Sequence, residues 1–363
     1  MSPAAPRPKS NAKSKSKATS KSTVKPKLSV KPKATPEPKP KSTATPKSKA
    51  KPGAKEKPGA KPKVAAAPGA IRVGISGWRY EPWRGAFYPE DLTQKRELEY
   101  ASRALPTIEI NGSFYSLQRP SSYASWYEDT PPGFVFSVKA PRYIMQILRS
   151  RDVVPPLANF FASGVANLRE KLGPILWQFP PFFKYDPELM DRFLSLLPHD
   201  TDEASALARR HDDKVAGRAQ MDFGPARALR HAIEVRNETF VDPAFAALLR
   251  KRNVAWVIAD TAGRWPEYED ITSDFVYIRL HGDEELYTSN YIDKVIARWA
   301  KRLRLWSDGA EPPDARRISS KPAPRAASLQ RRRDVFCYFD NTAKVHAPAN
   351  ARRLLDKLGV VWP

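Results

Sequence analysis

The sequence lacks the features that mark several common classes of protein. Cys337 is the only cysteine among 363 residues, which excludes an internal disulfide framework and a cysteine-based zinc site. No run approaches the roughly 18 apolar residues of a membrane span, and the N-terminus lacks the apolar stretch of about 7 to 15 residues found in secretory signals. We therefore expect a cytoplasmic protein with no membrane partner.

Residues 1–70 contain no Phe, Trp or Tyr and only two acidic residues. They hold 19 Lys+Arg and 13 Pro, and their net charge of +17 accounts for most of the +23 of the whole chain. Such a segment cannot bury enough apolar surface to offset the entropy lost on ordering its backbone, so we expect a disordered Lys/Pro/Ala-rich tail. Flexible lysines neutralise phosphates without reading a base sequence, which makes nucleic acid a candidate partner of the tail. The alternative is that the tail is only a solubilising spacer.

The rest of the chain contains eight short apolar runs of strand-like composition, each ending in or beside a polar residue. Seven of them precede a stretch in which apolar residues recur three and four positions apart, as in a helix with one buried face. The exception is the connection after Asp260, residues 261–274, which is irregular and acidic. The runs are residues 71–76, 107–111, 134–139, 174–179, 232–236, 254–260, 275–281 and 334–340.

This alternation predicts a parallel sheet with right-handed crossovers, and eight such units can close into a TIM-type (β/α)8 barrel. The competing architecture is an open, doubly wound sheet, but residues 77–89 contain no glycine-rich phosphate loop and no GxGxxG motif occurs elsewhere. We therefore predict one α/β barrel over residues 71–363, with polar surface insertions near 200–228 and 307–333. Three prolines mark helix starts, where the first turn has no N–H bond to lose: Pro187, Pro243 and Pro348.

Polar residues share one face of several predicted strands. Side chains alternate between the faces of a strand, so Glu109 and Asn111 lie opposite Ile108 and Ile110. In a barrel the apolar set must face the helices, which directs the polar set inward near the carboxyl ends, where the active sites of such barrels lie. The residues predicted at this mouth are Glu109, Asn111, Lys139, Gln178, Glu234, Arg236, Asp260, Tyr277, Arg279, His281 and Asp340.

This charged cluster admits two interpretations. In the first it is an interlocked ion-pair network that fixes the barrel, since each buried charge needs a partner. In the second it is a site in which Arg236, Arg279 and Lys139 bind a phosphate or carboxylate. The catalytic candidates in that site are Glu109, Glu234, Asp340 and His281. Asn111 and Gln178 would be further ligand-binding residues.

For metal ions and aromatic side chains at the predicted mouth, the sequence leaves alternatives open. Only His281 of the five histidines ends a predicted strand, which argues against a histidine zinc cluster. Carboxylates at the strand ends leave Mg²⁺ or Mn²⁺ as an alternative, but the sequence requires no metal and we assign no metal ligand. Among the aromatic residues of the first two loops, Trp78 and Tyr115 closely follow polar strand ends, where they could stack on a sugar or base. Packing across the barrel mouth is the alternative for them.

Six motifs together give the chain a specific resemblance to a known family: GISGW (74–78), FYP (87–89), EINGSFY (109–115), WQFPP (177–181), YIRLHG (277–282) and YFDN (338–341). They resemble the YecE-like family, domain of unknown function 72, over essentially all of residues 71–363. The resemblance implies a TIM-type barrel, adds Asn341 to the candidate site, and implies no established reaction. Its proposed link to nucleic-acid processing rests on barrel similarity to repair endonucleases, which is an analogy of fold.

Three functional hypotheses follow. The first is a nucleic-acid-associated enzyme that hydrolyses phosphodiester or related bonds at the carboxyl end of the barrel. The second is a hydrolase or isomerase of sugars or sugar phosphates, in which the arginines hold the anionic group. The third is a non-catalytic binding scaffold.

Overall fold

The computed structural model describes residues 69–282, 289–318, 332–341 and 345–362. The basic tail predicted over residues 1–70 lies almost entirely outside the described residues, as does much of the second predicted insertion. The described residues belong to one compact unit, Lys63–Pro363. No helix among them is long and apolar enough to cross a membrane.

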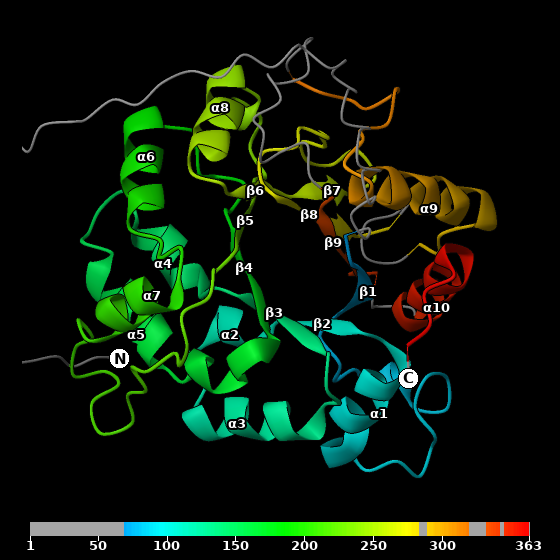
Figure 1. Cartoon of the computed structure of the whole chain (residues 1–363), viewed down its shortest axis with the longest axis horizontal. Coiled ribbons are helices and arrows are strands. Elements are labelled where there is room, and N and C mark those ends of the chain that lie inside the picture. The colour runs from blue at the N-terminus through cyan, green and yellow to red at the C-terminus, as the bar shows by residue number, and fades with distance from the viewer. Residues whose placement is uncertain (1–68, 283–288, 319–331, 342–344, 363) are drawn as a thin grey trace, which may run out of the picture. The chain divides into compact units, whose positions relative to one another are not determined.

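Every run predicted to be a strand is one, and all paired strands are parallel (Figure 1). The order across the sheet is β6-β5-β4-β3-β2-β1-β9-β8-β7. Most strands begin or end within two residues of the predicted limits. They are β1 Ile71–Ser76, β2 Thr107–Ile110, β3 Val135–Lys139, β4 Leu172–Gln178, β5 His231–Glu234, β6 Ala255–Trp256, β7 Ile258–Asp260, β8 Phe275–Leu280 and β9 Asp334–Phe339.

The two ends of this order are one segment of chain, so the sheet closes on itself. β6 and β7 are separated only by Val257, whose backbone N–H donates to the Ile233 carbonyl at 2.9 Å. β6 pairs with β5 on one side, and β7 pairs with β8 on the other. The segment therefore acts as the one strand predicted over residues 254–260. The TIM-type (β/α)8 barrel predicted from the sequence is confirmed.

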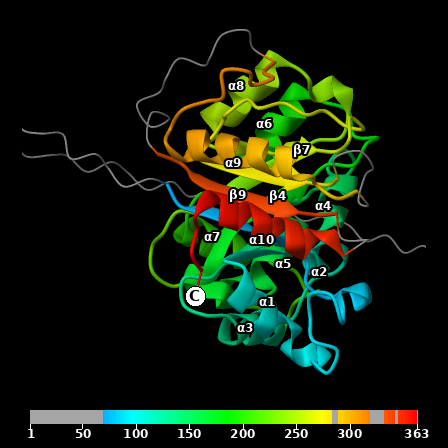
Figure 2. The ribbon, with the colours of Figure 1, turned by 90° about the vertical axis from the view of Figure 1, so that its right-hand side faces the viewer.

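Helices follow seven of the eight strands and cover the outside of the barrel. Figure 2 shows α9 and α10 side by side across β9, where they pack on each other and on the sheet. As predicted, the connection after Asp260 has no helix. The α-helices are α1 Glu97–Ala104, α2 Gly112–Tyr115, α3 Pro120–Asp129, α4 Arg142–Ile147, α5 Val154–Ala162, α6 Pro187–Ser195, α7 Thr201–Ala208, α8 Pro243–Lys251, α9 Asp293–Ser307 and α10 His346–Leu358.

Two of the three prolines start their helices as expected. Pro187 and Pro243 are the first residues of α6 and α8, and each follows an aspartate whose side chain accepts a backbone N–H of the first turn. α10 begins at His346, so Pro348 is its third residue. It still lies in the first turn, where a helix has no N–H bond to lose.

Residues 200–228 differ from the surface insertion expected of them. They include α7, and Ala204, Ala208, Val215 and Phe223 are buried in the main core. Polar residues surround these positions in the sequence, so the prediction of a surface insertion did not foresee their contact with the core, although most of residues 209–228 are exposed or half-buried. Within the segment, α7 packs against α5.

The barrel interior is divided into an apolar floor and a polar mouth. The floor is a separate buried cluster of Leu176, Ala232, Ala255, Val257, Ala259, Phe275, Tyr277, Phe336 and Tyr338. Ile108 and Ile110 instead belong to the core between the sheet and the helices, while Glu109 is fully buried inside the barrel. The alternation predicted for β2 is therefore the one observed.

Candidate functional site

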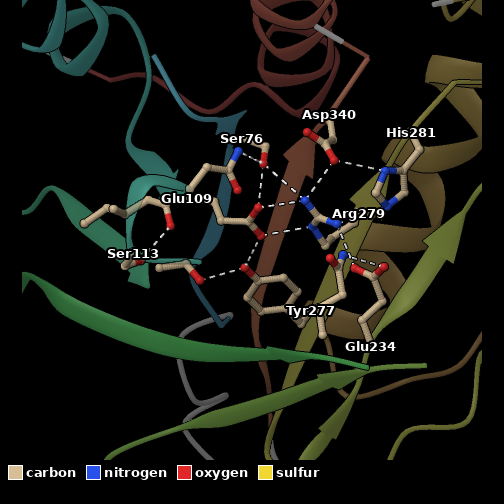
Figure 3. Close-up of polar contacts among 12 residues, drawn as sticks. Ser76, Glu109, Ser113, Glu234, Tyr277, Arg279, His281 and Asp340 are labelled. Carbon is tan, nitrogen blue, oxygen red and sulfur yellow. Dashed lines mark hydrogen bonds and ion pairs between the residues drawn. The ribbon is translucent and has the colours of Figure 1, made fainter. Parts of the chain in front are cut away.

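Arg279 is the centre of the polar mouth. Its side chain is fully buried and contacts carboxylates from three other strand ends (Figure 3). Nη1 donates to Glu234 Oε2 at 2.7 Å, and Nη2 donates to Asp340 Oδ2 at 2.9 Å. Nε and Nη2 donate to the two oxygens of Glu109 at 3.0 and 2.8 Å. Arg279, from β8, thus links the carboxyl ends of β2, β5 and β9 through ion pairs.

Two further contacts complete the surroundings of Arg279. Nη1 lies 3.2 Å from His281 Nε2, and Nη2 lies 3.2 Å from Ser76 Oγ. A guanidinium has five N–H groups in a fixed plane, and the contacts of Arg279 engage all of them. The expectation that Arg279 clamps a ligand is therefore not supported by its geometry, because a ligand would have to displace a protein carboxylate.

Glu109 is held as firmly as the arginine it pairs with. Oε1 accepts from Ser76 Oγ at 2.5 Å, and Oε2 accepts from the Tyr277 hydroxyl at 2.7 Å, in addition to the two bonds from Arg279. Ser76 is also joined to Asn111, whose Nδ2 donates to Ser76 Oγ at 2.9 Å. A carboxylate that accepts four hydrogen bonds from protein groups is held in one position and has no oxygen turned toward a ligand.

Glu234 occupies an equivalent position on the other side. Oε1 accepts from Gln178 Nε2 and from Arg236 Nε, both at 2.8 Å. Burial disfavours the charge of Glu234, but the positive charges of Arg236 and Arg279 outweigh it and hold the pKa of this carboxyl well below its ordinary value. Glu234 is therefore ionised throughout the physiological range.

Asp340 and His281 lie together above Arg279. His281 Nδ1 is 3.0 Å from Asp340 Oδ2. Burial and the charge of Arg279 lower the pKa of His281, so the ring is neutral near pH 7. Burial of Asp340 is outweighed by Arg279 and His281, which keep the pKa of its carboxyl below the ordinary value. Asp340 is thus an ionised group at the top of the network.

A pocket of about 540 Å³ opens over this network. Among the described residues, its walls carry the cations Lys139, Arg142 and Arg236 and one carboxylate, Asp340. Three aromatic rings and three amides supply most of the remaining wall. The lining residues are Tyr80, Asn111, Phe114, Tyr115, Lys139, Arg142, Gln146, Gln178, Pro180, Pro181, Arg236 and Asp340. The excess of positive charge favours an anionic ligand.

Lys139 is the buried cation of this pocket. It ends β3 with 7 % of its surface exposed, and its Nζ lies 4.3 Å from the centre of the Phe114 ring. Burial, aided by the charge of Arg279, lowers the pKa of Lys139 to about 8, although Glu109, Asp340 and Glu234 act in the opposite direction. The amine is therefore partly neutral at mildly alkaline pH.

Two arginines stand at the rim. Arg236 Cζ lies 3.8 Å from the centre of the Trp265 ring, so a stacked indole and the bond to Glu234 fix the guanidinium. Arg142 is an exposed residue of α4 whose Cζ lies 5.3 Å from the Tyr115 ring centre. It makes no ion pair with any residue the structure describes. Arg142 can thus reorient toward a ligand, whereas Arg236 is already positioned.

The predicted site residues fall into three groups. Six line the pocket: Asn111, Tyr115, Lys139, Gln178, Arg236 and Asp340. Four lie beneath or beside it in the ion-pair network: Glu109, Glu234, Arg279 and His281. The remaining two, Trp78 and Asn341, lie outside it.

Neither of these two has the expected place at the ligand. Trp78 is buried with its ring edge-to-face against Trp126 at 5.3 Å, so it packs the first loop, as the alternative interpretation had it. Asn341 is buried and its Nδ2 donates to the Ser289 carbonyl at 2.9 Å. Asp260, expected at the mouth, accepts a hydrogen bond from the Tyr291 hydroxyl at 3.2 Å and does not line the pocket.

Several residues of the pocket and of the network beneath it were not singled out from the sequence. Ser76, in the network, could have been found, because it ends the first strand in register with Glu109. Arg142 and Gln146 follow β3 at a spacing of four residues, which places them on one side of α4. Tyr80 donates its hydroxyl to the Ser76 carbonyl at 2.8 Å, a contact without a signal in the sequence.

The carboxylates of the mouth are arranged around arginines. Among residues 69–282, 289–318, 332–341 and 345–362, no group of three or more His, Cys, Asp or Glu side chains is placed to hold a metal ion. The network of Glu109, Glu234 and Asp340 instead converges on Arg279. A cation already occupies the position that their oxygens surround.

Comparisons with known proteins agree with this architecture. A crystal structure of a DUF72 family protein from Thermotoga maritima MSB8 is similar with a TM-score of 0.58 and 21 % identity, covering 80 % of this chain and 99 % of that one. A second, from Enterococcus faecalis V583, has a TM-score of 0.56 and 17 % identity, covering 81 % and 97 %. At these identities the likeness shows the fold alone.

Sequence comparison points the same way. The UPF0759 protein YunF of Bacillus subtilis (strain 168) is 28 % identical over 118 residues, which span 31 % of this chain and 41 % of that protein. The model of the family described as "Protein of unknown function DUF72" matches residues 72–362, which is almost the whole barrel. The chain therefore belongs to the DUF72 family.

Proposed function

We propose that the barrel mouth binds a small phosphorylated molecule, such as a sugar phosphate, and is the catalytic site of an enzyme that acts on it. The observation that carries this proposal is a pocket with three cationic side chains and one carboxylate at the carboxyl ends of the strands. Its volume of about 540 Å³ lies within the usual range for small-molecule sites, about 300–1,000 Å³.

The lining residues divide into an anion-binding side and a reacting side. Arg236 and Arg142 present planar guanidinium groups, which suit bidentate contact with phosphate. Lys139 and Asp340 supply a buried amine and an ionised carboxylate to the same pocket. Asp340 is thus the carboxylate of the reacting side, where it can accept a hydrogen bond from a ligand hydroxyl.

The buried network supports the site from below. Glu109 and Glu234 satisfy Arg279 and hold it in one position, so we assign them a positioning role in place of acid–base work. His281 positions Asp340 in the same way. Such a preorganised network keeps Arg236 and Asp340 in place when a ligand arrives.

Thermal shift with phosphorylated sugars and their unphosphorylated counterparts tests the proposal. We expect the phosphorylated members alone to raise the melting temperature, and Arg142→Gln with Arg236→Gln to abolish the rise. Arg192→Gln is the matched control, because Arg192 is an exposed arginine of α6 with only a 3.9 Å pair to Glu188. Equal responses from the double variant and the control would refute anion binding here. Binding without turnover of any bound compound would favour the scaffold hypothesis.

A second proposal concerns residues 1–70, whose net charge of +17 favours nucleic acid as a partner. If the barrel acts on nucleic acid, phosphodiester hydrolysis would occur at the same mouth. A gel-shift comparison of the full chain with a chain lacking residues 1–62, at low and moderate salt, separates the two parts. We expect salt-sensitive binding by the full chain only. Absence of binding by both chains would remove nucleic acid as a partner.

A further inference from the structure

Lys139 is unusual among the charged residues of the mouth. Arg279 is paired with Glu109, Glu234 and Asp340, whereas Lys139 Nζ makes no ion pair or hydrogen bond with any residue the structure describes. Nζ lies over the face of Phe114, 4.3 Å from the ring centre. The amine is buried, lines the pocket and has an apolar ring on one side.

A second buried lysine shows how the same side chain is satisfied when its role is structural. Lys171 also lies over a ring, 4.2 Å from the centre of Tyr127. Its Nζ donates to the Tyr127 and Thr130 carbonyls and to Thr130 Oγ1. Lys171 therefore uses its three N–H groups within the fold, and it does not line the pocket. Lys139 is also buried, but its Nζ makes no such hydrogen bonds with the described residues.

The chemistry of such an amine is known in general terms. A lysine that is desolvated and placed beside another cation loses its proton readily and becomes a nucleophile toward carbonyl carbon. The groups that face Lys139 electrostatically are Arg279, Glu109, Asp340 and Glu234, and the balance of burial and these charges sets its pKa to about 8. A sizeable part of the population is then the free amine near pH 8.

We propose that Lys139 forms an imine with the carbonyl group of a phosphorylated aldehyde or ketone bound in the pocket. This inference rests on the proposed function, because Arg142 and Arg236 would hold the phosphate while the carbonyl carbon faces Nζ. It names the substrate class of the site and the atom that attacks it.

The step balances without a further reagent. The Nζ lone pair forms a bond to the carbonyl carbon, and the π electrons of the carbonyl move to oxygen. The lone pair is available once the ammonium has given up one proton to solvent. The oxygen then takes one proton from Nζ and one from solvent, the C–O bond breaks and water leaves, which gives a protonated imine on Nζ. The positive charge of the lysine is conserved, so the network around Arg279 experiences no change of net charge.

Reductive trapping on the full chain tests the inference. The protein is incubated at pH 8 with glyceraldehyde 3-phosphate or dihydroxyacetone phosphate, reduced with borohydride, digested and mapped by mass spectrometry. We expect Lys139 to be labelled at least tenfold faster than Lys171 and faster than the exposed lysines of the described residues. Inorganic phosphate should slow this labelling, and unphosphorylated glyceraldehyde should label Lys139 no faster than exposed lysines.

The controls separate this inference from the proposal beneath it. Lys139→Arg keeps a cation but cannot form an imine, and should keep the thermal shift while losing the adduct. Labelling of Lys139 no faster than of exposed lysines, with the thermal shift intact, would overturn the imine and leave anion binding in place. Absence of the thermal shift in the unsubstituted protein would overturn both the imine and the binding of the phosphorylated ligand. The map on the unmodified protein decides the matter even if a variant fails to fold.

Discussion

Arg279 and Glu109 form a two-point ion pair inside the barrel, with Nε to Oε2 at 3.0 Å and Nη2 to Oε1 at 2.8 Å. Neither side chain has any exposed surface. The pair joins β8 to β2, strands that are not neighbours in the sheet. It therefore fixes the width of the mouth as well as the charge beneath the pocket.

Loss of Arg279 should destabilise the fold strongly. Arg279→Met leaves the carboxylates of Glu109, Glu234 and Asp340 close together without their shared cation. Removing one partner of a buried ion pair costs about 3–5 kcal/mol, so we expect a loss of at least that size in urea unfolding at pH 7. Arg192→Met, on an exposed pair, should cost less than about 0.5 kcal/mol. Equal stabilities of the two variants would contradict a central role for Arg279.

Part of the loss of folding stability at acid pH should come from His231, which lies outside the site. Trp177 Nε1 donates to His231 Nδ1 at 3.0 Å, and Nε2 lies 2.6 Å from the Pro198 carbonyl. A proton on Nδ1 would face an N–H group. Burial, together with the neighbouring His199, lowers the pKa of His231 to about 4, although the bond to the Pro198 carbonyl acts in the opposite direction. Because the folded-state pKa is depressed, the unfolded chain binds the proton first as pH falls below about 6.5.

The resulting loss of stability should run between about pH 6.5 and pH 4, at up to about 1.4 kcal/mol per pH unit from this group. His231→Gln should be less stable at pH 7, since it cannot reproduce both contacts, yet show a shallower slope in this window. Urea unfolding at half-unit pH steps measures both quantities. An unchanged slope in the variant would show that other groups, such as His281, account for the acid sensitivity.

The sequence predicted the strand ends well because a period of two is a strong constraint when one face of a strand is buried. That constraint placed Glu109, Glu234 and Arg279 inside the barrel. It could not show that the donors of Arg279 are all engaged, since this depends on distances between strands far apart in the chain. It also could not reveal Arg142, which stands on a short helix where no alternation applies.

Gly74 has a structural reason to be glycine. A Cβ at this position in β1 would lie 1.9 Å from the Thr107 carbonyl oxygen, which is backbone of the adjacent strand. The strands would have to separate, so Gly74→Ala should destabilise by more than the roughly 1–3 kcal/mol of ordinary overpacking. Gly263→Ala is not a fair control, because its positive φ adds strain. Ala104→Ser, on partly exposed α1, is a small-residue control that should change stability by less than about 1 kcal/mol.

Lys139 should lower the stability of the fold that carries it. Its folded-state pKa is depressed to about 8 by burial and Arg279, so below that pH the protein holds a buried charge that the unfolded chain would hydrate. The unfolded chain keeps its proton up to about pH 10.4, and stability contributed by this group therefore rises as pH rises from about 8. Lys139→Met should thus raise the free energy of unfolding at pH 7 by about 1–3 kcal/mol while removing imine formation.

Lys171→Met provides the opposite case in the same protein. Lys171 is also buried with a lowered pKa, but its Nζ donates three hydrogen bonds, including two to backbone carbonyls. Replacing it leaves those oxygens without their donor, so we expect a loss of stability of about 1–3 kcal/mol. The contrast in sign between the two variants distinguishes a lysine kept for chemistry from one kept for structure. Destabilisation by both would mean that Lys139 is held by contacts of comparable strength, and that its amine is not available to a ligand.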